Sequence, residues 1–292
     1  MRDRDSLQRF AFEAFPARGQ LVHLNSAWQA LLECSDYPDQ IRPLLGQALA
    51  AAVLLTSTLK FKGRMTLQLQ GDGPLYLIVV QCTHDLNVRG LARWRSEVPL
   101  SDLRAQLGAG RLVITIQSDV RSEPYQGVVA LNGATLNECL AKYFHASEQL
   151  PTRLWLAADD QTAAGLLLQR MPGGHPSSAE EDWSRVQLLA DTVRDDELIG
   201  IENLTLLKRL FDKDDLRVFD SRPVRFHCSC STDRIETMLR SLGEAELRSI
   251  LSEQDQIAVD CEICNKKRQF DRIDVARIIA GKAGPDSPTS LH

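Results

Sequence analysis

The sequence has no long hydrophobic run and no secretory signal. Its longest uncharged apolar stretch, Pro43 to Leu59, is interrupted by Gln, Ser and Thr and falls short of the ~18–20 apolar residues that cross a bilayer. The opening residues, MRDRDSLQRFAF, mix acidic and basic side chains and lack an apolar segment followed by a small-residue cleavage site. We therefore expect no transmembrane helix and a cytoplasmic protein.

The sequence also lacks a large excess of either positive or negative charge. Lys and Arg number 34 and Asp and Glu number 39, which gives a formal net charge of −5. A protein that binds nucleic acid through its phosphates needs a concentrated basic surface, because affinity comes from neutralising phosphate charge. This balance disfavours a nucleic-acid-binding function.

Common catalytic and nucleotide-binding signatures are absent as well. There is no Walker loop and no Ser, His and Asp order typical of a hydrolase. The GDGP segment at 71–74 has neither the third Gly nor the following helix of a dinucleotide-binding loop. No common catalytic signature is therefore apparent, and we expect that the protein is not an enzyme.

What is present indicates a globular chain with more than one part. Hydrophobic residues make up 43% of the 292 residues, and at roughly 150 residues per domain the length predicts about two folding units. The pattern divides the chain into an N-terminal α+β domain at 1–171, a metastable helical linker at 172–220, and a zinc-binding redox-switch domain at 221–292 that ends in a mobile tail.

The N-terminal part combines helix and strand patterns. A helical pattern opens at Asp36 or Tyr37, and apolar residues recur at three- and four-residue spacing from Ile41 to Leu55. The Ala-rich middle predicts a core helix packed closely against a sheet. Apolar and polar residues alternate over 65–70, and the GDGP turn then leads into the apolar run 75–80, which predicts a hairpin. Strand candidates cluster instead of alternating with helices, which favours a layered α+β domain. They are 111–117, 127–131, 153–158 and 164–171, with a helix over 135–147.

The segment 172–220 carries the acidity of the chain. It contains 12 Asp and Glu against 6 Lys and Arg, a charge of −6, whereas the remainder of the chain carries +1. Amphipathic helices are predicted over 183–193 and 203–211. Their few apolar residues barely offset an ordering cost of ~1–2 kcal/mol per residue, so we expect a weakly held linker.

Two cysteine pairs mark the segment 221–292. This part has few large apolar residues, and a domain below ~70–80 residues needs a staple such as a metal. Cys228 and Cys230 form one pair, and Cys261 and Cys264 form the other. Four soft thiolates suit a closed tetrahedral Zn²⁺ site, and clustered cysteines in a reducing compartment are more often metal ligands or redox-active thiols than structural disulfides. We predict a zinc site with these four ligands.

The same thiolates are targets for oxidation by peroxide or hypochlorous acid. Structural zinc supplies ~10–16 kcal/mol in small finger peptides, so its loss is expected to unfold the small domain. A plain structural zinc knuckle without a sensing role is the alternative. His227 is an alternative ligand, although beside two cysteines we expect it to be only a neighbour. The scattered Cys34, Cys82 and Cys139 are predicted to be small core hydrophobes.

Two other functions compete with redox sensing. A zinc-ribbon nucleic-acid module is suggested by the cysteine pairs and the basic run at 266–268, but no longer basic stripe with interleaved aromatics accompanies them. A thiol-disulfide oxidoreductase would use Cys261 as its attacking thiol. Redox Cys-x-x-Cys motifs usually open a helix after a strand, whereas this pair precedes a basic loop.

Along most of its length the sequence resembles the heat shock protein 33 family of redox-regulated holdase chaperones. The resemblance rests on the two cysteine pairs at this separation and on four longer stretches in the same order. These stretches are TSTLKFKGRMTLQLQGDGPL (56–75), YQGVVAL (125–131), SEQLPTRLWL (147–156) and AAGLLLQRMP (163–172). It covers essentially residues 6–285.

The resemblance implies a zinc-bound, reduced and inactive monomer that becomes a chaperone under oxidative stress combined with unfolding conditions. It implies disulfides between Cys228 and Cys230 and between Cys261 and Cys264 once zinc is lost. It also implies that the linker, about 179–220, unfolds and exposes a surface for unfolded client proteins, and that the active form is a homodimer.

The apolar residues of the linker are the candidates for that client-binding surface. In the reduced state we expect them to pack on the first domain as ordinary amphipathic helices, and on unfolding to become available to clients. The candidates are Trp183, Leu188, Leu189, Leu204, Leu206, Leu207, Leu210 and Phe211.

Overall fold

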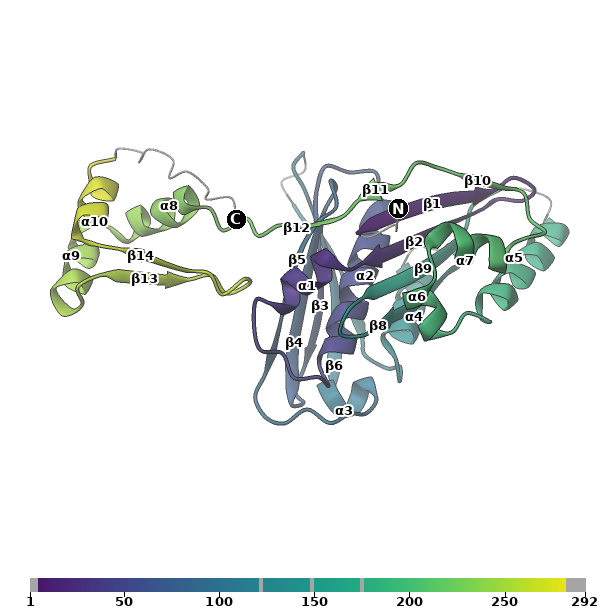
Figure 1. Ribbon diagram of the computed structural model, residues 1–292, viewed down its shortest axis with the longest axis horizontal. Helices are drawn as coiled ribbons and strands as arrows, with labels where there is room; N and C mark the ends of the chain where they lie inside the picture. Colours follow the sequence, from purple (N-terminus) through teal and green to yellow (C-terminus); the bar gives the residue numbers. More distant parts are fainter. Residues whose placement is uncertain (1–4, 121–122, 148–149, 174–175, 282–292) are drawn as a thin grey trace. The chain divides into compact units, whose positions relative to one another are not determined.

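The computed structural model describes residues 5–120, 123–147, 150–173 and 176–281. It divides into two compact units, Met1–His227 and Cys228–His292 (Figure 1). The tail beyond Gly281, which we predict to be mobile, lies outside the described residues. Helices and strands are mixed along the chain, which confirms the α+β class.

The first unit contains most of the elements. In chain order they are β1 (Ser6–Phe12), β2 (Ala17–Leu24), α1 (Ser26–Leu32), α2 (Arg42–Thr58), β3 (Gly63–Gly71), β4 (Leu75–Thr83), β5 (Asn87–Trp94), α3 (Leu103–Leu107), β6 (Gly110–Ser118), β7 (Tyr125–Ala130), α4 (Leu136–Ser147), β8 (Thr152–Ala158), β9 (Ala163–Arg170), α5 (Pro176–Ala190), α6 (Asp195–Gly200), α7 (Asn203–Leu210), β10 (Leu216–Val218), β11 (Arg222–Pro223) and β12 (Arg225–Phe226).

Helix α2 is the centre of the first unit. It contacts strands of two sheets, one with the order β10-β1-β2-β9-β8 and β11 beside β1, the other with the order β12-β5-β4-β3-β6-β7. Nearly every residue from Leu44 to Thr56 is buried, because small Ala side chains let both sheets approach the helix closely. The predicted core helix is confirmed, but it begins at Arg42 and not at Asp36, since Pro43 occupies its first turn.

The predicted hairpin is also confirmed. Strands β3 and β4 pair antiparallel around the GDGP turn, and Met65, Leu67 and Leu69 are buried while the residues between them are half-buried. Because alternate side chains of a strand share one face, the buried side chains of β3 lie on the face of the second sheet that packs against α2. Strands β1, β2 and β5 were not predicted, since their sequences mix polar and apolar residues without clear alternation.

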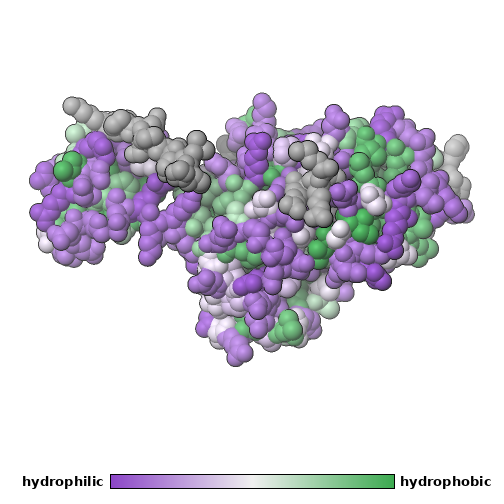
Figure 2. Space-filling model, viewed as in Figure 1, coloured by the Kyte–Doolittle hydropathy of each residue, from purple (hydrophilic) through white to green (hydrophobic). Residues whose placement is uncertain are grey.

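The first sheet is covered on both faces. One face packs on α2, and the other is covered by the helices α5, α6 and α7 of the predicted linker, which lie together at one end of the unit in Figure 1. Figure 2 shows that hydrophobic patches reach the surface over this part of the chain, between larger hydrophilic areas. The linker is therefore a packed outer layer of the first unit.

A strap at 216–227 follows the linker helices and returns along the first unit. Strand β10 pairs with β1, β11 pairs with the start of β1, and β12 pairs in parallel with β5. Between them the Val224 N–H donates to the Asp5 carbonyl. The boundary between the two units thus falls between His227 and Cys228, and residues 221–227 lie in the first unit. The division into domain, linker and zinc domain as separately stable parts stays a prediction.

The second unit is small. A hairpin of β13 (Ile257–Asp260) and β14 (Lys267–Phe270) packs with α8 (Thr232–Leu242), α9 (Glu244–Glu253) and α10 (Arg272–Ile279). Seven apolar side chains of its described residues are buried in one cluster. They are Ile235, Leu239, Leu247, Ile257, Phe270, Val275 and Ile278. So small a core is what a metal-stapled domain is expected to have.

No helix in the described part of the chain combines the length and the apolar character that crossing a membrane requires.

Candidate metal centre

The first cysteine pair lies on a short segment that precedes α8. Ser231 ends this segment and caps the helix, since its hydroxyl accepts a hydrogen bond from the Arg234 N–H at 3.2 Å. The Arg234 guanidinium donates to the Ser229 hydroxyl, also at 3.2 Å. These contacts fix the backbone of the Cys-x-Cys segment where it meets the helix.

The second cysteine pair lies in the turn of the β13–β14 hairpin. The Cys261 N–H donates to the Lys266 carbonyl at 3.1 Å, and the Asn265 N–H donates to the Cys261 carbonyl at 2.8 Å. Asn265 has a φ of 51°, in the left-handed region that Asn tolerates better than other non-Gly residues. The tight turn that holds Cys264 beside Cys261 therefore closes without glycine.

The fold brings the four cysteines together. Their Sγ atoms all lie within 4.8 Å of one another. The Sγ atoms of Cys228 and Cys261 are 3.7 Å apart, and those of Cys230 and Cys264 are 3.3 Å apart. Sulfurs bound tetrahedrally to Zn²⁺ at ~2.3 Å would be about 3.8 Å apart, so the donor set fits this ion in number, chemistry and spacing.

The thiols differ in how readily they ionise. Burial raises the pKa values of Cys230 and Cys264, because a buried thiolate loses its hydration. Burial opposes ionisation of Cys261 too, but the backbone N–H groups of Cys264 and Ile263 donate to its sulfur and bring its pKa down to about 7. The hairpin turn thus supplies a thiolate near neutral pH, the form that binds a metal.

None of the seven cysteines forms a disulfide in this structure. The two short sulfur contacts join one pair to the other, as in a shared metal site. Disulfides within each pair, implied by the family resemblance, stay a prediction about the oxidised protein.

The remaining candidates from the sequence lie elsewhere. His227 is not in the cysteine cluster. Its backbone N–H donates to the Val88 carbonyl in the first unit. Cys82 and Cys139 are fully buried, and burial raises both pKa values, that of Cys82 to about 12. These two are core hydrophobes as predicted. Cys34 is only half-buried.

Most of the predicted client-binding residues are covered in this structure. Trp183, Leu206, Leu207, Leu210 and Phe211 are buried in one cluster, and Leu189 packs against it. Leu188 and Leu204 are 69% and 54% exposed. This matches the packing expected for the reduced state and leaves client binding by these residues a prediction.

The surface beneath the linker helices was missed by sequence reasoning. The Phe211 ring lies 6.0 Å from the ring of Phe10 and 5.2 Å from that of Phe12, measured between centroids, and both phenylalanines lie on β1. The spacing of Phe10 and Phe12, two residues apart, was the available signal, since alternate residues of a strand share one face.

Two ion pairs also hold the linker layer. Arg185 on α5 donates from Nη1 to Asp214 at 3.0 Å, and Arg209 on α7 lies 2.6 Å from Glu197 on α6. The Asp214 and Glu197 side chains are only 7% and 9% exposed. Some of the linker acidity therefore serves to join its own elements.

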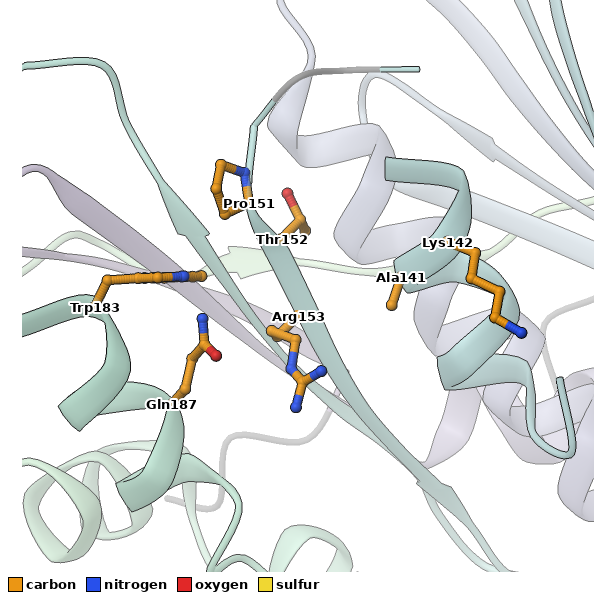
Figure 3. Close-up of a pocket in the computed structure, with 7 residues that line it drawn as sticks. All are labelled: Ala141, Lys142, Pro151, Thr152, Arg153, Trp183 and Gln187. Atoms are coloured by element: carbon orange, nitrogen blue, oxygen red, sulfur yellow. The ribbon is translucent and has the colours of Figure 1, made fainter. Parts of the chain in front are cut away.

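A groove of about 530 Å³ runs beside the linker. Figure 3 shows its walls: Trp183 and Gln187 come from α5, Ala141 and Lys142 from α4, and Pro151, Thr152 and Arg153 from the start of β8 or just before it. Because α5 forms one wall, the groove exists in this form only while the linker is docked.

Known proteins match this chain over nearly its whole length. A family model described as Hsp33 protein matches residues 5–271. A 33 kDa chaperonin of Nitrosococcus oceani is 49% identical over 294 aligned positions that cover 100% of both chains. A 33 kDa chaperonin of Methylobacillus flagellatus is 44% identical over 280 positions, 95% of each chain.

A solved structure has the same fold. The crystal structure of the 33 kDa chaperonin (heat shock protein 33 homolog) of Thermotoga maritima matches with a TM-score of 0.81 at 22% identity, covering 95% of this chain and 98% of the other. The family match and the full-length relatives confirm what the cysteine pairs and the four longer stretches indicate: this chain belongs to the Hsp33 family.

Proposed function

We propose that the protein is a redox-regulated holdase chaperone whose small unit is kept folded by zinc bound to Cys228, Cys230, Cys261 and Cys264. A chaperone function, and not an enzymatic one, follows from membership of a family whose curated members are named chaperonins. The observation that carries the zinc part is the cluster of four sulfurs in a unit with only seven buried apolar side chains among its described residues.

Metal binding supplies most of the stability of the small unit in this proposal. Structural zinc contributes ~10–16 kcal/mol in finger peptides, whereas whole domains are stable by only ~5–15 kcal/mol. Loss of the metal would therefore unfold the described part of the small unit, 228–281.

Oxidation is the proposed trigger. Cys228 with Cys230, and Cys261 with Cys264, each lose two electrons and form one disulfide. One hydrogen peroxide per disulfide accepts those electrons and two protons and leaves as two waters. The sulfurs would then no longer carry the charge that binds Zn²⁺, so they could not hold the ion.

The client surface in this proposal is the apolar layer between the linker helices and the first sheet. Trp183, Leu206, Leu207 and Phe211 are buried there now, and undocking of the linker would present them, together with Leu188 and Leu204, to unfolded proteins. The linker charges would keep such a complex soluble. We further propose a monomer in the reduced state, a homodimer in the active state, and a cytoplasmic location, where the thiols stay reduced.

A metal count run beside an aggregation assay tests the proposal. Peroxide with mild heat should release about one zinc per chain and give a protein that suppresses aggregation of a thermally unfolding client, and reductant should reverse both effects. Cys→Ser at all four positions should abolish zinc content and oxidant response, while Cys82→Ala should keep both. Unchanged zinc content in the fourfold variant would refute the ligand assignment.

The thiol oxidoreductase alternative is weakened by geometry. Cys261 and Cys264 lie in the turn of an antiparallel hairpin, not at the start of a helix, where the helix N-terminus would activate a redox thiol. Catalytic reduction of insulin disulfides by the reduced protein is the result that would favour it.

A further inference from the structure

A small cavity inside the first unit has an arginine in its lining. Its volume is about 120 Å³. Its floor is formed by the buried side chains of Leu55, Met65, Ile114 and Phe144. Its half-buried rim includes Leu59, Ile116 and Leu150, together with the arginine Arg18 of β2. Thr58, Tyr143 and Gln169 add polar groups to the lining. Arg18 is the one charged residue among the described residues that line the cavity, and the other lining side chains are apolar.

Arg18 makes only neutral contacts. Its Nε and Nη2 atoms donate to Gln169 Oε1 at 3.0 and 2.6 Å, and Nη2 donates to the Thr58 carbonyl at 3.3 Å. Within the described residues no carboxylate lies at ion-pair distance from Arg18, and its Nη1 group makes no hydrogen bond. A guanidinium has five donors, so two remain for a further acceptor.

The charge of Arg18 is uncompensated in this setting. Burial, and to a smaller extent the nearby Arg9, lower the pKa of Arg18, which means that the surroundings disfavour its positive charge. An anion at the rim would be stabilised by this charge more than by an exposed one, because little water screens the pair.

We propose that this cavity binds a short-chain aliphatic carboxylate. The carboxylate accepts hydrogen bonds from Nη1 of Arg18 at the rim, where the positive charge of the guanidinium strengthens them, and the alkyl tail contacts the apolar side chains of the floor. A dry cavity of about 150 Å³ accommodates a benzene molecule, so a cavity of this size takes a tail of about four carbons.

The rival source of a carboxylate is the chain itself. Glu148 precedes the rim residue Leu150 by two positions and lies outside the described residues. The experiment therefore needs one arm for a free carboxylate and one for Glu148.

Sodium valerate titrated into the reduced, full-length protein tests the proposal, with methyl chemical shifts as the readout. We expect saturable shifts at Met65, Ile114 and Ile116, with a dissociation constant on the order of 1 mM for so small a ligand. Valeramide, which lacks the charge, should bind about tenfold more weakly or worse. Acetate, which lacks the tail, should also bind about tenfold more weakly or worse.

Matched variants locate the binding. Arg18→Met should abolish the shifts. Arg64→Met is the matched control, because Arg64 also donates two hydrogen bonds to one amide oxygen, that of Gln117, but at an exposed site. This variant should retain the shifts. Ile116→Phe keeps Arg18 but fills the cavity near its rim, and it should also abolish binding in a protein that still melts cooperatively.

Three results would overturn the proposal. The first is an absence of saturable shifts in the wild-type protein up to the solubility limit of the salt. The second is equal binding of valeramide and valerate. The third is valerate binding that appears only in Glu148→Gln, which would assign the anion to the chain itself.

Discussion

The two units of this protein differ in the interactions available to stabilise them. In the first, α2 is buried between two sheets, and a second apolar cluster covers the other face of one of them. In the second, the described residues bury seven apolar side chains and gather four thiols at one point. The contrast suggests that hydrophobic burial holds the first unit and that metal binding holds the second, which makes only the second sensitive to thiol chemistry.

Removal of the metal should give the largest effect. With a strong chelator and reductant present, the second unit is expected to lose stability of about 10 kcal/mol or more, so its amides should exchange at the rate of an unfolded chain. Amides of α2 should stay protected. Hydrogen exchange followed by mass spectrometry resolves the two regions.

If chelation leaves the amides of Leu239 and Ile278 protected, the seven buried apolar residues are enough to keep the second unit folded. The contrast between the two units would then be wrong. It would also be wrong if α2 lost protection to the same extent.

A cavity in the first core should give the next largest effect. Leu49 is fully buried on α2, and Leu49→Ala is expected to cost about 2–5 kcal/mol of unfolding free energy. Zinc content should not change, because the ligands lie in the other unit. Denaturant unfolding with a parallel metal count measures both, and Leu100→Ala, at a side chain that is 85% exposed, is the matched control.

Replacing the linker ring that packs on β1 should have a smaller and more local effect. Phe211→Leu keeps an apolar side chain but removes the ring contacts with Phe10 and Phe12, worth about 0.5–1.5 kcal/mol each. Linker amides should exchange faster while those of α2 do not. Client binding should then begin at a lower temperature at the same degree of oxidation.

An unchanged exchange rate in Phe211→Leu, or an equal increase in α2, would mean that the linker layer does not undock separately from the core it covers.

Loss of one linker ion pair should give the smallest effect. Asp214→Asn keeps the shape of the side chain and removes its charge opposite Arg185. Because Arg185 is 43% exposed, the expected cost is only about 1 kcal/mol, and it should shrink further in high salt. Asp196→Asn, at a side chain that is 70% exposed, should have no measurable effect on the exchange of α5 amides.

Local chemistry made parts of this molecule predictable. The spacing of the cysteines, the apolar periodicity of α2 and the GDGP turn of the β3–β4 hairpin each depend on residues close together in sequence. In the first unit the pattern also predicted α4 and the strands β6, β7, β8 and β9.

Other parts depended on residues far apart. The pairing of β1 with β10 joins Phe10 to Val218, a partner that no local pattern identifies. The contact of Phe211 with the phenylalanines of β1 also joins distant segments, and so do the ion pairs between the linker elements. The linker appeared from its sequence as a charged, weakly apolar segment, whereas its docked face is well buried.

The sequence by itself determined which atoms can hold a metal and which helix forms the centre of the core, because ligand chemistry and helical periodicity are properties of short segments. Only the tertiary structure decided what covers the first sheet, where the strap returns, and that Arg18 lies at the rim of a cavity without a carboxylate partner among the described residues. Those features arise from contacts between distant segments, whose register is fixed by packing and not by the local sequence.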